Sequence, residues 1–290
     1  MKGVFNACAK LNLSLDVTGR RPDGYHDMRM VMQSVSLCDE VELSLRPGGQ
    51  ITIQSGVRYI PNDERNIAFK AAALFFETYG ITDTGVGIVL KKRIPVCAGL
   101  GGGSSDGAAV LFGLGELTGL HPSRAELEKL GERLGSDVPF CVRGGTALAE
   151  GRGEILTDLP ALPDCGIVIC KPSFSISTPA LFKTLDEHEI RVHPGTEELI
   201  SMLGSGDLAR LSRRMYNVFE DVLPRRCGEV FTIKNALLDF GALGCAMSGT
   251  GSAVFGIFDS MEKAAAAHAG LSGRYRDCFL CRPTGKNFER

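Results

Sequence analysis

Apolar and polar residues alternate along the first third of the chain, as they do in half-buried β-strands. Residues 4–17 alternate loosely and end in the turn sequence Thr-Gly-Arg-Arg-Pro-Asp-Gly. Residues 31–36, 41–45 and 51–53 continue the pattern, separated by Asp-Glu and by Pro-Gly-Gly. The pattern predicts several separate strands, so we expect this part of the chain to be rich in β-structure.

Helical spacing of apolar residues appears next, with Ile67, Ala71, Leu74 and Phe75 on one face of a predicted helix at 66–79. Further predicted helices cover 106–117, 125–134, 197–203, 207–220, 229–240 and 262–269, and further strands cover 87–90, 167–170, 275–281 and both sides of 248–252. Strands and helices do not alternate strictly, which favours the α+β class. Because the pattern breaks at 160–163, we expect domains at 1–160 and 161–290.

Composition narrows the kind of partner. The chain has 290 residues, 44% of them apolar and 23% charged, with a net charge of −2. These values are typical of globular proteins and lack the basic excess of a nucleic-acid binder. The ten cysteines are predicted to be reduced thiols, because the chain is long and shows no signal peptide. With no apolar run long enough for a membrane helix, we expect a cytoplasmic protein that binds small molecules and no membrane.

A glycine-rich segment at 95–109 carries the most chemical information. It holds Gly99, Gly101, Gly102 and Gly103 between a strand and a helix. Glycines at such a place let backbone N–H groups and a helix N-terminus approach an anion, and phosphate fits best. Neither the dinucleotide fingerprint nor the Walker A pattern is present. The alternative is a flexible turn, although the Ser-Ser-Asp that follows also suits helix capping and magnesium coordination.

Three further places are ambiguous when each is taken alone. The segment 247–253 has the glycines of a plain hairpin. The segment 135–140 could be a helix exit in which Asp137 caps a local turn. Lys10 could be a solvated strand lysine, but Asn12 lies two residues on and therefore on the same face of the strand.

Taken together, these motifs resemble a known superfamily. The segments 9–12, 24–26, 95–105, 135–139 and 248–252 have the order and spacing found in GHMP kinases. The glycine loop alone indicates only the superfamily. The combination of Lys10, Tyr25, His26 and Asp137 resembles the branch that phosphorylates cytidine-diphosphate-linked methylerythritol in the non-mevalonate isoprenoid pathway. The resemblance implies an N-terminal domain like the second domain of ribosomal protein S5 and a ferredoxin-like C-terminal domain, both of the GHMP kinase type.

The resemblance also implies an activity and a set of site residues. ATP, with Mg²⁺, would phosphorylate the 2-hydroxyl of the cytidyl polyol. Asp137 would accept the hydroxyl proton, and Lys10 would be its electrostatic partner. The ATP-binding residues would be Asn66, Lys92, Pro95, Gly99, Leu100, Gly101, Gly102, Gly103, Ser104 and Ser105. The substrate-binding residues would be Asn12, Tyr25, His26, Phe182, Gly249 and Thr250, with cytosine stacked between Tyr25 and Phe182. The metal ligands are unknown.

Some choices stay open at this point. Members of the family often have Asn-Ala where this chain has Asp106 and Gly107, so Asp106 could be a helix cap or a metal ligand. Lys92 is preferred over Lys91 for the nucleotide, and Phe182 could instead be an ordinary core residue. The alternative functions are a homoserine-type or mevalonate-type GHMP kinase and a non-catalytic binding protein on the same fold. We expect a monomer or a weak homodimer.

Overall fold

Two β-sheets organise the chain, which is described for residues 1–288 in a computed structural model. The first sheet has the strand order β3-β4-β2-β1-β8, with β5 on β2 and β6 on β5. The second has the order β11-β7-β10-β9. The strands are β1 (Lys2–Arg20), β2 (His26–Pro47), β3 (Ile51–Ser55), β4 (Thr84–Lys91), β5 (Thr146–Gly151), β6 (Ile155–Asp158), β7 (Gly166–Lys171), β8 (Tyr216–Asn217), β9 (Gly244–Met247), β10 (Val254–Phe258) and β11 (Asp277–Cys281).

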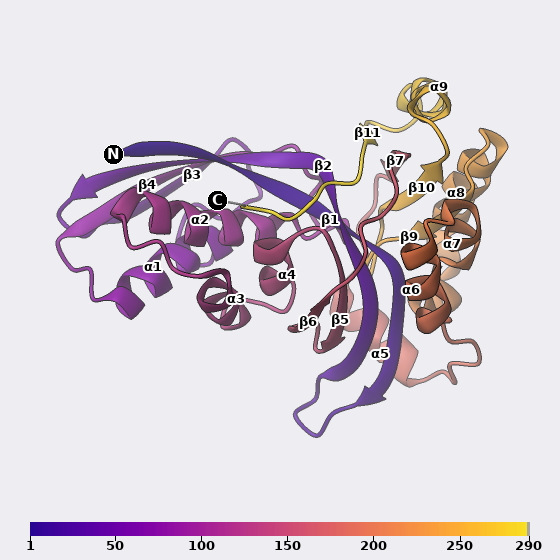
Figure 1. The fold of residues 1–290 in the computed structure, drawn as a ribbon, viewed down its shortest axis with the longest axis horizontal. Helices are drawn as coiled ribbons and strands as arrows, with labels where there is room; N and C mark the ends of the chain where they lie inside the picture. The colour runs from indigo at the N-terminus through magenta and orange to yellow at the C-terminus, as the bar shows by residue number, and fades with distance from the viewer. Residues whose placement is uncertain (289–290) are drawn as a thin grey trace.

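The antiparallel pair of β1 and β2 runs the length of the first sheet and extends toward the second half of the chain (Figure 1). The separate strands expected at 31–36 and 41–45 are one continuous strand, because Asp39 and Glu40 pair with β1 in the ladder and do not form a turn. Cys8 and Cys38 face each other in this pair and form a disulfide. The expectation that all cysteines are reduced is therefore wrong for these two.

Four helices pack beneath the first sheet: α1 (Ile67–Tyr79), α2 (Gly102–Thr118), α3 (Arg124–Glu132) and α4 (Val138–Arg143) (Figure 1). Their buried side chains join those of β2 and β4 in one core, which includes Phe75, Leu90 and Leu111. A second core lies between the two sheets, where Leu11 and Leu13 of β1 cluster with Ile169 and Phe255. The two sheets therefore share a core, and β1 belongs to the boundary between them.

The second sheet carries the remaining helices. These are α5 (Thr178–Asp186), α6 (Thr196–Ser205), α7 (Leu208–Arg214), the 3₁₀ turns η1 (Val218–Val222) and η2 (Arg225–Cys227), α8 (Glu229–Asp239) and α9 (Met261–Ser272). The predicted helix 207–220 is wrong beyond Arg214. The chain there forms β8 and pairs with Ser14 and Leu15 of β1, so tertiary pairing overrides the apolar spacing. The sheets change between β6 and β7, while the domain division at 160/161 stays a prediction.

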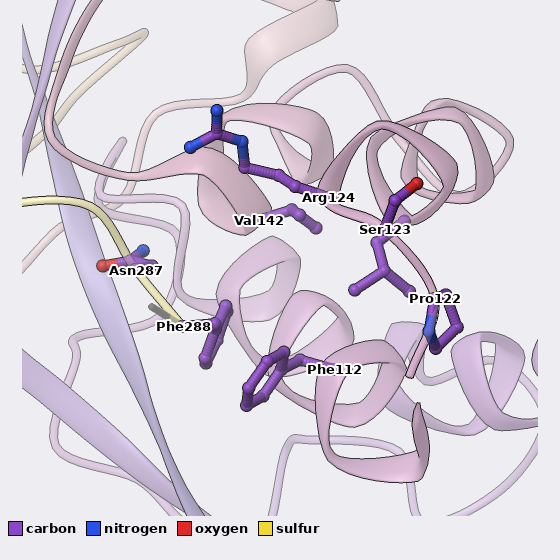
Figure 2. A pocket seen from close by; sticks show the side chains of 8 residues that line it. Phe112, Pro122, Ser123, Arg124, Val142, Asn287 and Phe288 are labelled. Atoms are coloured by element: carbon purple, nitrogen blue, oxygen red, sulfur yellow. The ribbon is translucent and has the colours of Figure 1, made fainter. Parts of the chain in front are cut away.

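The last described residues return to the first sheet (Figure 1). Asn287 donates its backbone N–H to the carbonyl of Arg143 (3.0 Å) and its Nδ2 to that of Cys141 (2.9 Å), while Phe288 stacks on Phe112 at 4.7 Å. Figure 2 shows these side chains beside a hollow of about 360 Å³ between α2 and α3. Among the described residues that line the hollow, none belongs to the predicted site. Within residues 1–288 no helix could cross a membrane.

Candidate active site

The glycine loop leads directly into α2. Gly101 is the N-cap, in the left-handed region at φ +70°, and the helix begins at Gly102. The first-turn N–H groups of a helix have no partners within it and, with the helix dipole, make an anion site. A side chain at Gly99 would place its Cβ 2.0 Å from the carbonyl oxygen of Ser248, so only glycine fits this approach. The segment therefore enters the helix in close contact with the loop around Ser248.

A groove of about 560 Å³ follows this loop and is large enough for a small-molecule ligand. Most of the predicted ATP-binding residues line it: Asn66, Lys92, Pro95, Gly99, Leu100, Gly101, Gly102, Gly103 and Ser104. Ser105 is fully buried and donates its hydroxyl to the carbonyl of Cys8 at 2.6 Å. Its side chain faces β1, so it anchors the loop to the sheet.

Lys10, Asn12 and Asp137 meet beside the loop. The Nζ of Lys10 donates to Oδ1 of Asn12 at 2.7 Å and lies 3.5 Å from Oδ2 of Asp137. Lys10 is buried, whereas the side chain of Asp137 is 34% exposed. Asp137 stands at the N-cap position of α4, but its carboxylate makes no capping bond within the described residues. The local-cap alternative is therefore wrong, and the role of Asp137 as the base stays a prediction.

The second glycine loop contacts the same cluster. It joins β9 and β10 as the hairpin alternative required, yet the N–H of Gly249 also donates to Oδ1 of Asn12 at 3.0 Å. The Ser248 hydroxyl donates to the carbonyl of Gly99 at 2.9 Å. Thr250 shares a 2.7 Å hydrogen bond with Thr178, which lines the groove. The two glycine loops therefore form one site.

Asn217 is a site-building residue that the sequence analysis missed. Its Nδ2 donates to the carbonyls of Met247 (2.7 Å) and Gly249 (2.8 Å), and so it holds the second glycine loop. The prediction of a helix at this position concealed it. The sequence signal for Asn217 was only an asparagine directly before a turn, and this signal alone does not identify a site residue.

The predicted base-binding residues come together in part. The rings of His26 and Phe182 stack with their centroids 4.6 Å apart, and Nε2 of His26 lies 2.7 Å from Oδ1 of Asp186. Phe182 also packs on the buried core, so it is a core contact as well as a candidate platform. Tyr25 is 56% exposed, and its ring lies under the guanidinium of Arg152, 5.3 Å from the ring centroid. The sandwich of Tyr25 and Phe182 around cytosine stays a prediction.

Two of the predicted ATP-binding side chains have structural partners. Asn66 caps α1 by accepting from the N–H of Ala68 at 2.9 Å. Lys92 lies between two buried carboxylates, Asp39 and Asp106. Asp106 is therefore no helix cap, since the N-cap of α2 is Gly101. Whether Asn66 and Lys92 also contact the nucleotide stays a prediction.

The environment of Asp106 changes its acidity. Burial raises the pKa of its carboxyl group to about 7, with Asp39 adding to the shift and Lys92 opposing it. Burial lowers the pKa of Lys92, but Asp106 and Asp39 outweigh burial, so the net shift is upward. Lys92 therefore stays charged near neutral pH, while Asp106 titrates there.

Asp106→Asn is expected to change how the stability of the protein depends on pH. Because the folded pKa of Asp106 lies above its ordinary value, the folded state binds more protons than the unfolded state between the two values, and the free energy of unfolding falls as pH rises. Asparagine lacks this loss, so the variant should gain stability relative to the wild type from about pH 5 to about pH 8. Urea unfolding at both pH values measures the gain. An equal difference at both would contradict the assignment.

Comparison with known proteins places this site in a class. Residues 66–145 match the GHMP kinases N terminal domain, and residues 197–277 match the GHMP kinases C terminal domain. A homoserine kinase from Cytophaga hutchinsonii has the same fold, with a TM-score of 0.75 over 99% of this chain and 95% of that one at 22% identity. The fold is that of a GHMP kinase, which confirms the predicted α+β fold.

More similar relatives define the family. A 4-diphosphocytidyl-2-C-methyl-D-erythritol kinase of Acetivibrio thermocellus is 46% identical over 95% of this chain and 97% of its own, and one of Clostridium botulinum is 44% identical over 96% and 99%. A crystal structure of 4-(cytidine 5'-diphospho)-2C-methyl-D-erythritol kinase has 33% identity and a TM-score of 0.81, over 98% of this chain and all of that one. The chain belongs to the 4-diphosphocytidyl-2-C-methyl-D-erythritol kinase family.

Proposed function

We propose that this protein transfers the γ-phosphate of ATP to the 2-hydroxyl of 4-diphosphocytidyl-2-C-methyl-D-erythritol. Family membership supports the kinase activity, ATP as donor and the choice of substrate. The observation that carries the proposal is the position of Lys10 and Asp137. Their side chains lie 3.5 Å apart beside the glycine loop that leads into α2, which is called the phosphate loop below. A Cβ at Gly101 of this loop would come within 2.9 Å of the Lys10 side chain.

The chemistry follows from this arrangement. Backbone N–H groups at the start of α2 bind the phosphates. Asp137 accepts the proton of the substrate hydroxyl, and the hydroxyl oxygen forms a bond to the γ-phosphorus of ATP. The bond between the γ-phosphorus and the bridging oxygen breaks, which releases ADP. Lys10 orients the Asp137 carboxylate and offsets negative charge on the transferring group. Asn12 fixes Lys10 through the 2.7 Å hydrogen bond.

Magnesium is proposed to accompany ATP. Within residues 1–288 no group of three or more His, Cys, Asp or Glu side chains is arranged to hold a metal ion. Mg²⁺ in kinase sites usually keeps several waters and binds through substrate phosphates and one or two carboxylates, so it does not require such a group. Asp106 is the acidic residue in the described lining of the groove, and Asp137 lies next to Lys10; the metal ligands themselves stay unassigned. When bound, Mg²⁺ would neutralise charge on the phosphates.

Recognition of the cytosine base gives the test of the substrate. We expect Tyr25→Ala to weaken CDP binding by about tenfold to a hundredfold, because base-aromatic stacking is worth about 1–3 kcal/mol. Tyr25 is largely exposed, so the substitution spares the core. Calorimetry with CDP, UDP and ATP measures the effect, and ATP affinity should not change. Equal binding of CDP and UDP to the wild type would sink the cytidyl assignment.

The alternatives receive less support. The likeness to homoserine and mevalonate kinases, at 22% and 19% identity, extends to the fold alone. A non-catalytic binding protein would not need a lysine and a carboxylate paired beside a phosphate loop. The cytoplasmic location, the absence of nucleic-acid partners and the monomer or weak homodimer stay predictions.

A further inference from the structure

Three charged side chains meet beneath the phosphate loop, almost out of reach of solvent. The exposed fractions of the Asp39, Lys92 and Asp106 side chains are 0%, 4% and 4%. The Nζ of Lys92 pairs with Asp39 and lies 2.5 Å from Oδ2 of Asp106. Burying three charges removes their hydration and is weak evidence for stability, so a role in fixing geometry is a reasonable hypothesis.

Each member of this trio comes from a different element and holds a different part of the loop. Asp39 of β2 accepts at Oδ1 from the backbone N–H groups of Arg93 (2.5 Å) and Ile94 (2.8 Å), which lead into the glycine segment. Lys92 follows β4, and its Nζ lies 3.5 Å from the carbonyl of Gly102 in the first turn of α2. Asp106 lies on the next turn. The trio thus connects the segment before the loop to the helix that ends it.

We propose that Asp106 is a positioning residue for the phosphate loop. Its Oδ2 holds the ammonium group of Lys92, and Lys92 in turn fixes the first turn of α2, so that the N–H groups there point into the groove. The proposal rests on the proposed function for the identity of the anion, the phosphates of ATP.

The role of Asp106 depends on an acceptor oxygen and not on a negative charge. Lys92 requires only an oxygen to accept its hydrogen bond, and an amide oxygen also accepts. With both carboxylates ionised, the trio carries one net negative charge, which repels a polyphosphate. Oδ1 of Asp106 is closed to solvent and has no hydrogen-bond partner among the described residues, although Asp106 belongs to the lining of the groove. A metal-ligand role would need the negative charge, which an asparagine lacks.

Two substitutions at Asp106 separate these roles. Asp106→Ala removes the acceptor and should weaken ATP binding by about tenfold or more, as expected for the loss of a hydrogen bond to a charged group. Asp106→Asn keeps an acceptor and should stay within about twofold of the wild type. Calorimetry gives the ATP affinities. Steady-state kinetics should show a raised KM for ATP in the alanine variant, with kcat little changed and CDP binding unaffected.

A neighbouring lysine supplies the matched control. Lys91 is 55% exposed and pairs with Glu40 and Glu42 at the surface, so Lys91→Met should leave ATP affinity unchanged.

Several results would overturn the proposal. If Asp106→Asn loses as much affinity as Asp106→Ala and needs more Mg²⁺, Asp106 acts through its charge as a metal ligand. If Asp106→Ala binds ATP normally, or Lys91→Met loses as much affinity, the trio does not position the loop. A wild type that binds no ATP would instead contradict the proposed function, and the positioning role with it.

Discussion

Asp137→Asn is expected to lower kcat by about 10²- to 10⁴-fold, the usual contribution of a positioned general base. The amide cannot accept the hydroxyl proton, whereas the KM values should change little, because the carboxylate acts mainly in the transition state. Asp137 is partly exposed and makes no capping bond among the described residues, so the fold should survive the substitution.

The control for this variant is Asp259→Asn, which changes a surface carboxylate paired with Lys263. It should keep wild-type kinetics. Thermal unfolding shows whether each purified variant is folded. A folded Asp137→Asn protein with nearly wild-type kcat would exclude Asp137 as the base.

Lys10→Met should also lower kcat strongly, by about 10²- to 10³-fold, as expected when a preorganised charge is removed from the reacting centre. Methionine keeps much of the apolar volume of the buried lysine stem, which the neighbouring Gly101 contacts. Asp137 remains partly hydrated in this variant, so its charge is not left buried alone.

Combining the two substitutions tests whether Lys10 and Asp137 work as a unit. Residues that act together give losses smaller than the product of the single losses. Single-turnover rates of the wild type, both single variants and the double variant complete the cycle. A double loss equal to the product would count against the pairing.

Short-range features of this protein could be predicted from its sequence. The glycines around Gly101 predicted the start of a helix that suits an anion, and α2 begins there. The two-residue spacing of Lys10 and Asn12 predicted that both lie on one face of a strand, and their side chains are hydrogen-bonded on β1. These predictions succeed because they depend on backbone geometry within a few residues. The close approach of Gly99 to Ser248 could not be predicted from the spacing of residues, although the family resemblance includes both segments.

Features that depend on contacts between distant parts of the chain could not be predicted from the sequence. Apolar spacing at 207–220 predicts a helix, but Asn217 lies in β8 because β1 offers a pairing edge there. The family resemblance implies a nucleotide contact at the basic strand end, where Lys92 is preferred over Lys91, but the partner of Lys92, Asp39, lies 53 residues earlier in the chain. Nothing local identifies such a partner. The choice between a cap and a metal ligand for Asp106 could not be made for the same reason.

The most direct test of the central claim is transfer of phosphate from ATP to a panel of alcohols, followed by phosphorus NMR of the products. The panel holds 4-diphosphocytidyl-2-C-methyl-D-erythritol, its uridine analogue, homoserine and mevalonate. We predict a new phosphate monoester on the 2-hydroxyl of the cytidyl compound, with kcat/KM far above that for the other three, and loss of this product in Asp137→Asn. Preferred phosphorylation of homoserine or mevalonate, or no transfer to the cytidyl compound, would contradict the account.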